Sequence, residues 1–285
     1  MQRSASAQEP TVPDDSKVVT AQRARARGRR FRLTGGDRKL QAGSFVIGLV
    51  LWELVGRFVV TNPLFFAPFS SVMASVIRLT REGVLVNDFI VTVQEVIYGL
   101  AGAIVVGVFV GFLIGLSRTA RVALQPWLNA LYSTPLAALA PLFILWFGIG
   151  QASKVATVFV SAIFPIIINS AAGIATTDQN FVDVARSFGL SKGQVFRKVL
   201  LPSALAFIAT GVRLAVGRGL VGAVVAELFG AQAGLGFRIY VSGQAFQTAD
   251  LLAGVLVLAA TGVVAIGLVE RIERRLAPWR VEVAL

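Results

Sequence analysis

Six strongly apolar stretches run along the chain, and short polar segments separate them. A helix needs about 20 predominantly apolar residues to cross a hydrocarbon layer of roughly 30 Å. The stretches occupy residues 42–60, 89–116, 123–147, 152–175, 206–230 and 251–269. The pattern predicts an all-α polytopic membrane protein with about six transmembrane helices.

The connections and the prolines refine this prediction. Phe147-Gly148-Ile149-Gly150 is a tight turn that joins the third and fourth stretches into a helical hairpin. Between the first and second stretches, Ser70 or Ser71 is placed to cap a short amphipathic helix. Pro141 and Pro165 lie within apolar stretches, where the missing N–H predicts a kinked or unwound helix.

Small residues recur every four positions along the second stretch. They are Gly99, Ala103, Gly107, Gly111 and Gly115. Such a stripe lets another helix approach closely. We interpret it first as packing within the chain, with a subunit interface or a lining of the translocation path as the alternatives.

A polar, basic segment over residues 176–205 interrupts the apolar pattern. Asp178 is a good N-cap for a helix over residues 179–187, and Gly189 is well placed to end it. The first part of this segment is therefore predicted to be a helix and not an irregular connector.

A second helix follows in the same segment. Ser191 and Gln194 have capping-box spacing. Pro202 either ends this second helix or lies in the first turn of the next span. The two helices together predict a helical hairpin.

The first hairpin helix carries an apolar stripe at i, i+3, i+4 and i+7. It consists of Phe181, Val184, Ala185 and Phe188. Aromatic side chains that face water are unfavourable, so the stripe requires a groove, either on this protein or on a partner.

Composition supports a membrane protein and excludes several kinds of chemistry. Apolar residues make up 55% of the 285 positions, charged residues 15%, and the mean hydropathy is +0.74. Cysteine and histidine are absent, which excludes disulfides and thiolate sites and removes the commonest metal ligand and general base. We expect no metal, cofactor or catalytic residue in this chain.

Basic residues set the orientation. With the N-terminus inside, the outer segments hold only Arg78, Arg81, Lys154 and Arg238, while most other basic residues fall inside. The net charge of +12 then indicates contact with anionic lipid and not with nucleic acid.

This orientation gives the predicted organisation. Residues 1–41 form a basic flexible cytoplasmic tail, residues 42–270 the transmembrane domain, and residues 271–285 a cytoplasmic C-terminal tail. The hairpin over 176–205 is then also cytoplasmic.

Charged and polar residues inside the spans are the remaining candidates. Glu53 and Arg57 are spaced for an i,i+4 pair, which we interpret as structural. Asn169 and Glu227 are candidate pathway or gate residues, with a helix anchor as the alternative for Glu227. Gln94 is a further polar candidate for the pathway.

Two arginines complete the set of charged candidates. Arg213 and Arg218 are expected to start the fifth span and to face the inner water layer.

The hairpin resembles the EAA loop of ABC-type importer permeases. That pattern is E-A-A, three residues, G, nine residues, I, one residue, L-P, and here it falls on Asp183-Val184-Ala185, Gly189, Val199 and Leu201-Pro202. The spacing matches throughout, while Asp183, Val184 and Val199 replace Glu, Ala and Ile.

The resemblance extends beyond the hairpin. The segments PLFILWFGIGQASK, VVAELFGAQAGLGFRI and ADLLAGVL…ERIERRL resemble permeases of the nitrate, sulfonate and taurine importer group, with coverage from about residue 45 to 280.

The resemblance implies a membrane subunit of an ATP-driven importer of the bacterial inner membrane. The first hairpin helix would be a coupling helix in a cleft of a separate ATPase. Two permeases and two ATPases would form the transporter, and a periplasmic or lipid-anchored binding protein would deliver a small, anionic solute.

Two other classes of protein fit less well. A stand-alone transporter or channel would need coupling groups or a selectivity filter, and the spans offer few charges. An intramembrane enzyme would need clustered catalytic residues. The chain has no G-x-x-x-x-G-K-[ST] motif, so ATP and Mg would bind to the partner ATPase.

Overall fold

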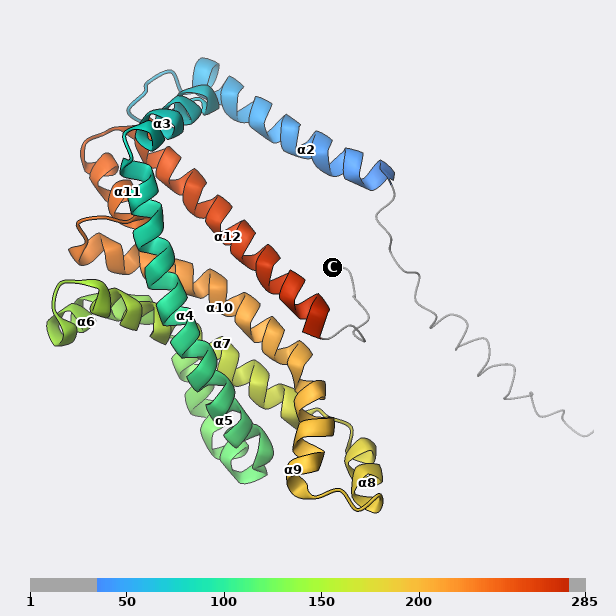
Figure 1. Ribbon diagram of the computed structural model, residues 1–285. Coiled ribbons are helices and arrows are strands. Elements are labelled where there is room, and N and C mark those ends of the chain that lie inside the picture. Colours follow the sequence, from blue (N-terminus) through green and yellow to red (C-terminus); the bar gives the residue numbers. More distant parts are fainter. Residues whose placement is uncertain (1–34, 277–285) are drawn as a thin grey trace, which may run out of the picture. The chain divides into compact units, whose positions relative to one another are not determined.

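The computed structural model describes residues 35–276, and no β-strand occurs among them (Figure 1). The helices are α2 (Gly35–Leu54), the π-helical turn η1 (Val55–Val59), α3 (Phe69–Arg81), α4 (Val84–Leu116), α5 (Arg118–Ser133), the 3-10 turn η2 (Leu136–Leu139), α6 (Ala140–Phe147), α7 (Gln151–Ala175), α8 (Gln179–Ser187), α9 (Lys192–Val195), the π-helical turn η3 (Phe196–Leu200), α10 (Leu201–Gly230), α11 (Leu235–Gln244) and α12 (Thr248–Leu276). The predicted all-α class is confirmed.

From Gly48 onward, the described residues form one compact unit, and the first part of α2, up to Ile47, falls outside it. Most residues of the two predicted tails lie outside the described residues. The described part of the N-terminal tail is the start of α2, which begins at Gly35, and the described part of the C-terminal tail is the end of α12, which continues to Leu276. The tail boundaries and the cytoplasmic placement of the termini stay predictions.

Between residues 35 and 276, five helical segments are long and apolar enough to span a membrane. They are Lys39–Val59, Val84–Leu116, Gln151–Ala175, Lys192–Gly230 and Thr248–Arg275. The α5 helix and the segment Leu136–Phe147 provide a sixth if the two are counted as one span, and they are bent by 76°. The predicted number of about six is confirmed, but the third span is broken.

The break follows from Pro135 and not from the prolines that we singled out. Thr134 is extended (ψ 137°), as expected for a residue before proline, and this ends α5. Pro141 lies in the first turn of α6, where a missing N–H interrupts no helical bond. Pro165 lies inside α7, which continues through it to Ala175. The expected unwinding is therefore absent at Pro165.

The core of the unit is α7, against which α4 and α10 both pack extensively. The small-residue stripe of α4 lies on α7: Gly107 faces Ile166, Gly111 faces Ser170 and Gly115 faces Ile174. A Cβ at Gly111 would lie 2.8 Å from the carbonyl oxygen of Ile167, so these helices pack backbone against backbone. Packing within the chain is therefore confirmed for this stripe.

The short helix predicted between the first two spans exists as α3, but neither serine caps it. The helix begins at Phe69, and the Glu53 carboxylate accepts hydrogen bonds from the Ser70 N–H (2.9 Å) and its hydroxyl (2.9 Å). Glu53 also pairs with Arg57. The structural interpretation of this pair is supported, because its acid caps the next helix.

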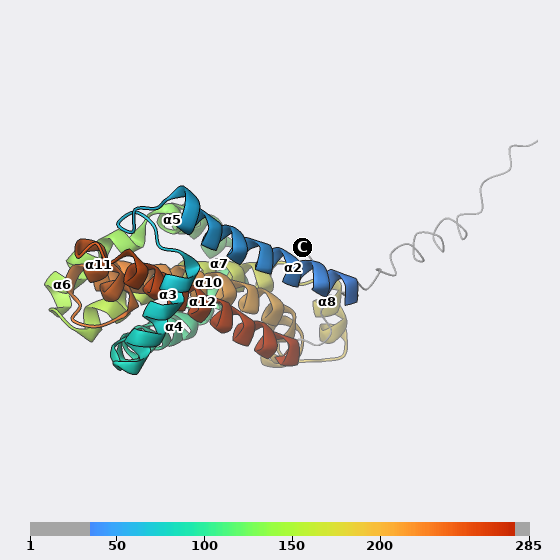
Figure 2. The same ribbon diagram turned by 90° about the horizontal axis from the view of Figure 1, so that it is seen from above.

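Two groups of short helices lie at opposite ends of the unit. Figure 1 shows α8 and α9 at one end and α3 and α11 at the other. Figure 2 views the chain from above and shows α3 beside α4 and α12, with which it packs.

Candidate coupling hairpin and buried polar network

The first hairpin helix forms where its capping residues predict. α8 runs from Gln179 to Ser187, and the Asp178 carboxylate accepts a hydrogen bond of 2.9 Å from the Asn180 N–H. Gly189 follows the helix with φ +75°, a left-handed conformation that favours glycine. The chain can therefore reverse directly after α8.

The second hairpin helix is only the first turn of a much longer one. Ser191 and Gln194 form the predicted capping box, with bonds of 2.8 and 3.4 Å. α9 then continues through η3 into α10, and Pro202 lies in the first turn of α10. Of the two alternatives for Pro202, the start of the span is correct.

The apolar stripe of α8 divides between two faces. Ala185 is buried together with Val182, and both pack against Val195 of α9. Phe181, Val184 and Phe188 remain 63%, 54% and 80% exposed. Ala185 is therefore covered by this protein, the first of the two alternatives for the stripe, together with Val182, which the stripe did not include. The need of the other three side chains for a partner stays a prediction.

A shallow groove of about 360 Å³ runs between α8 and the start of α10. Its lining residues are Phe181, Val184, Ala185, Lys198, Val199, Pro202 and Ser203. Asp183 is exposed and is not among the residues that line the groove. Its Oδ1 accepts a hydrogen bond from Gln179 Nε2 at 3.1 Å and lies 3.8 Å from Arg186 Nη1. The groove brings Val184 and Ala185, from the first segment of the matched pattern, together with Val199 and Pro202 from its end.

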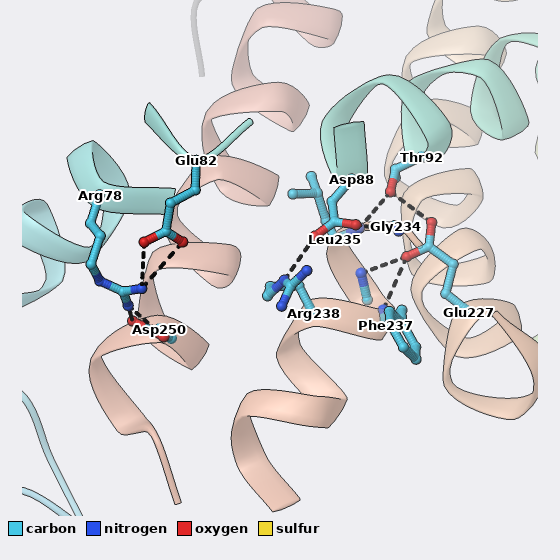
Figure 3. A network of polar contacts seen from close by, with 11 residues as sticks. Arg78, Glu82, Asp88, Thr92, Glu227, Gly234, Leu235, Phe237, Arg238 and Asp250 are labelled. Atoms are coloured by element: carbon cyan, nitrogen blue, oxygen red, sulfur yellow. Dashed lines mark hydrogen bonds and ion pairs between the residues drawn. The ribbon is translucent and has the colours of Figure 1, made fainter. Parts of the chain in front are cut away.

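A second cluster, the buried polar network, joins α4, α10 and the start of α11 (Figure 3). The Thr92 hydroxyl donates to Glu227 Oε1 at 2.6 Å and accepts from the Leu235 N–H at 2.8 Å. The Gly236 N–H also donates to Glu227, which is fully buried. Glu227 therefore has partners from two other helices, although it has none nearby in sequence.

Asp88 completes the attachment of α11. It accepts hydrogen bonds from the Gly234 N–H (3.0 Å) and from Arg238 Nε (2.8 Å) (Figure 3). The first N–H groups of a helix lack intrahelical partners, so Asp88, Thr92 and Glu227 together satisfy them. These contacts are those of a helix anchor.

Two acids near the network are paired with basic residues, Asp88 with Arg238 and Glu95 with Lys154. Glu95, also buried on α4, lies 3.3 Å from Lys154 Nζ of α7. Asp88 and Glu95 were not among the predicted candidates, and Lys154 was predicted only as a basic residue of an outer segment. The available signal was the spacing of Asp88, Thr92 and Glu95 at i, i+4 and i+7, which places three polar residues on one face of an apolar helix.

A neighbouring pair ties α3 to α12. Arg78 Nη2 lies 2.7 Å from both carboxylate oxygens of Asp250, and Arg78 also pairs with Glu82 (Figure 3). The hydrogen bond and charge of Asp250 raise the pKa of Arg78 above its usual range.

Asn169, the other candidate pathway residue, is partly buried where α7 packs on α10. Its Nδ2 donates to the Pro165 carbonyl at 2.8 Å, and its Cβ lies beside Gly211 of α10. A pathway role for Asn169 or Glu227 stays a prediction. Gln94 is exposed on α4.

Residues 103–278, which include the hairpin and the bent span, match the family described as binding-protein-dependent transport system inner membrane component. This match covers more than half of the chain. The chain belongs to this family. Because the family is a transport component, membership agrees with the prediction that the chain is not itself an enzyme.

Relatives of this permease carry names from the importer group that the sequence resembles. The taurine transport system permease protein TauC of Escherichia coli (strain K12) is 32% identical over 250 residues, which is 86% of this chain and 90% of TauC. The putative aliphatic sulfonates transport permease protein SsuC of Bacillus subtilis (strain 168) is 32% identical over 232 residues, which is 81% of this chain and 84% of SsuC.

A solved structure shares the fold. The permease resembles a chain of the inward-facing MetNI methionine ABC transporter with a TM-score of 0.61 and 20% identity, over 69% of this chain and 98% of that chain. The suspected family and the permease fold are thus confirmed.

Two arginines of the permease lie deeper in α10 than expected. The helix starts at Leu201, so neither Arg213 nor Arg218 begins it. Arg213 forms ion pairs with two acids of α12: its Nε lies 3.8 Å from Glu270 Oε1, and its Nη2 pairs with Glu273. Arg218 Nη1 donates to the Tyr132 carbonyl at 3.0 Å, at the break of the bent span.

Proposed function

We propose that this permease transmits ATP-driven movement from a separate cytoplasmic ATPase to its transmembrane helices through the hairpin of α8, α9 and η3. The exposed side chains of Phe181, Val184 and Phe188 carry this proposal. Burial of a large apolar side chain stabilises an interface by about 2 kcal/mol, so three on one short helix favour a partner.

The packed side of α8 explains how force would be transmitted. An isolated helix of this length is marginal in water. Val182 and Ala185 fix α8 on Val195, and the chain then continues without a break from Lys192 into α10. Movement of a docked α8 would therefore tilt a transmembrane helix as a rigid body.

The proposed assembly has two copies of the permease, two ATPases and a binding protein that delivers the solute. ATP and Mg would bind to the ATPases. The names of the relatives specify taurine and aliphatic sulfonates, so we assign the imported solute to small molecules that carry an anionic group.

The decisive experiment purifies the permease with its ATPase and binding protein and measures ATP-dependent uptake of taurine, ethanesulfonate and nitrate into liposomes. We expect Phe188→Asp to abolish co-purification of the ATPase. Phe65→Asp is the matched control, because Phe65 is 77% exposed near α3, at the opposite end of the unit.

The outcomes separate the importer from a stand-alone transporter or channel. Solute flux through the purified permease without ATPase or ATP would contradict the proposal. Retention of the ATPase by Phe188→Asp would show that the hairpin is not the docking element.

A further inference from the structure

Arg213 and Arg218 lie five residues apart in α10, and of the two only Arg213 has ion-pair partners among the acids of residues 35–276. Arg213 pairs with two carboxylates of α12. Arg218 forms no ion pair with any residue between positions 35 and 276. Its partner is Tyr132, through the carbonyl at 3.0 Å and through the ring, whose centroid lies 3.9 Å from Cζ.

The position of Arg218 along the helix makes this charge significant. It lies 12 residues before Gly230, the end of α10, which corresponds to about 18 Å at 1.5 Å per residue. A hydrocarbon layer is about 30 Å thick. A charge at such a depth faces the interior of a bundle or a water-filled cavity, since contact with lipid is unfavourable.

The break of the bent span lies beside Arg218 and supports the same conclusion. Thr134 and Pro135 leave the helical conformation directly after Ser133, the last residue of α5, and all three are exposed in the permease. Non-helical backbone at membrane depth is tolerated where protein buries it or where it lines water. The described residues leave this backbone exposed, so it is available to line an aqueous path.

The surface of α10 next to Arg218 is open. Leu214, Gly217 and Val221 lie one turn before, beside and one turn after it, and all three are exposed. A Cβ built at Gly217 meets no atom within 4 Å. A small solute can therefore approach the guanidinium along this side of the helix.

We propose that Arg218, braced by Tyr132 at the break of the bent span, is an anion-binding subsite of the translocation pathway. It receives the sulfonate or nitrate oxyanion of the imported solute. This inference rests on the proposed function and identifies where the anionic group of the solute binds.

The chemistry of the side chain fits this role. A guanidinium has five N–H donors in a planar fork that matches oxyanions, and the Tyr132 carbonyl occupies one of them. The carbonyl and the ring hold the fork in one orientation, so the other donors remain for a ligand. A single braced cation also permits release, which a pathway requires.

Aqueous access to this position can be tested directly because the chain contains no cysteine. In the assembled transporter, we expect the thiol of Arg218→Cys to react with a small charged thiosulfonate, read as added mass on the permease. Ala215→Cys is the control, since Ala215 is fully buried on the same helix. Equal inertness of both variants would overturn the subsite.

Uptake tests the charge. We expect Arg218→Gln to lower ATP-dependent ethanesulfonate uptake at least about tenfold, the effect of losing one charged hydrogen bond, and Arg218→Lys to lower it less. Stimulation of ATP hydrolysis by loaded binding protein should persist. Wild-type uptake by Arg218→Gln would overturn the subsite, whereas lack of ATP-dependent uptake by the unmutated transporter would overturn the proposed function.

A purely structural role has a different signature. If Arg218 only capped α5, Arg218→Gln would lower the melting temperature and leave uptake per folded transporter unchanged. If Arg218→Gln does not fold, the uptake of Arg218→Lys and the thiol labelling still decide the question.

Discussion

Glu227 is the residue on which the attachment of α11 depends. Its buried carboxylate accepts hydrogen bonds from the Thr92 hydroxyl and from the N–H groups of Gly236 and Phe237. Removing a buried acceptor leaves its donors unsatisfied, and this penalty exceeds the net value of the bonds themselves.

We therefore predict that Glu227→Ala destabilises the permease by about 3 kcal/mol and that Glu227→Gln, which keeps one acceptor oxygen, destabilises it less. Thermal unfolding of the purified protein measures both. Glu82→Ala is the control, because this half-exposed acid makes only a surface pair with Arg78 and should change stability by less than about 1 kcal/mol. Equal melting temperatures for Glu227→Ala and the control would show that the network does not anchor α11.

Sequence predicts residue contacts well only where the partners are close along the chain. Asp178 and Ser191 cap helices within three residues of themselves, and both caps were predicted. Thr92 and Glu227 are 135 residues apart, and no local pattern pairs them. The pairing exists because α4 and α10 both pack on α7.

At the scale of the element, α8 shows how one short helix serves two surfaces. Val182 is buried within the hairpin, whereas Val184, two positions on, is half exposed beside the groove. Because both residues are valines, the same substitution at each position distinguishes an effect on the stability of the hairpin from an effect on docking of the ATPase.

Val182→Ala should destabilise the hairpin by about 1–2 kcal/mol, because it removes buried methyl groups and leaves a cavity. Limited proteolysis would detect faster cleavage near α8. Val184→Ala should leave proteolysis unchanged and weaken retention of the ATPase. The reverse pattern for the two variants would contradict the assignment of the faces.

The turn after α8 gives another element-scale prediction. Gly189 has φ +75°, and a Cβ there would meet no atom within 4 Å, so backbone conformation alone restricts this position. Gly189→Val should cost about 1–2 kcal/mol and reduce solute-stimulated ATP hydrolysis several-fold.

Asparagine tolerates the left-handed conformation, so Gly189→Asn should retain most of the activity. Membrane insertion of both variants serves as the control for folding. Equal activity of the two variants would mean that the turn is not constrained by this conformation.

At the scale of the whole molecule, the helices of the compact unit depend on close approach of α4 and α7. Gly111→Leu should destabilise the permease by about 3 kcal/mol or more, since its side chain would meet Ser170 and the backbone of α7. Gly267→Leu is the matched control, because the space around Gly267 in α12 is open. Thermal unfolding compares the two, and equal stability would refute the packing argument.

The sequence by itself determined the helical class, the number of spans, the caps of the hairpin and the family, because apolar length, capping chemistry and motif spacing are local properties of a chain. Only the tertiary structure decided which face of α8 is free, where the third span breaks, which partners Glu227 has and how deep Arg218 lies. Those features depend on contacts between helices that are far apart in sequence, and periodicity along one helix does not specify which helix will pack against it.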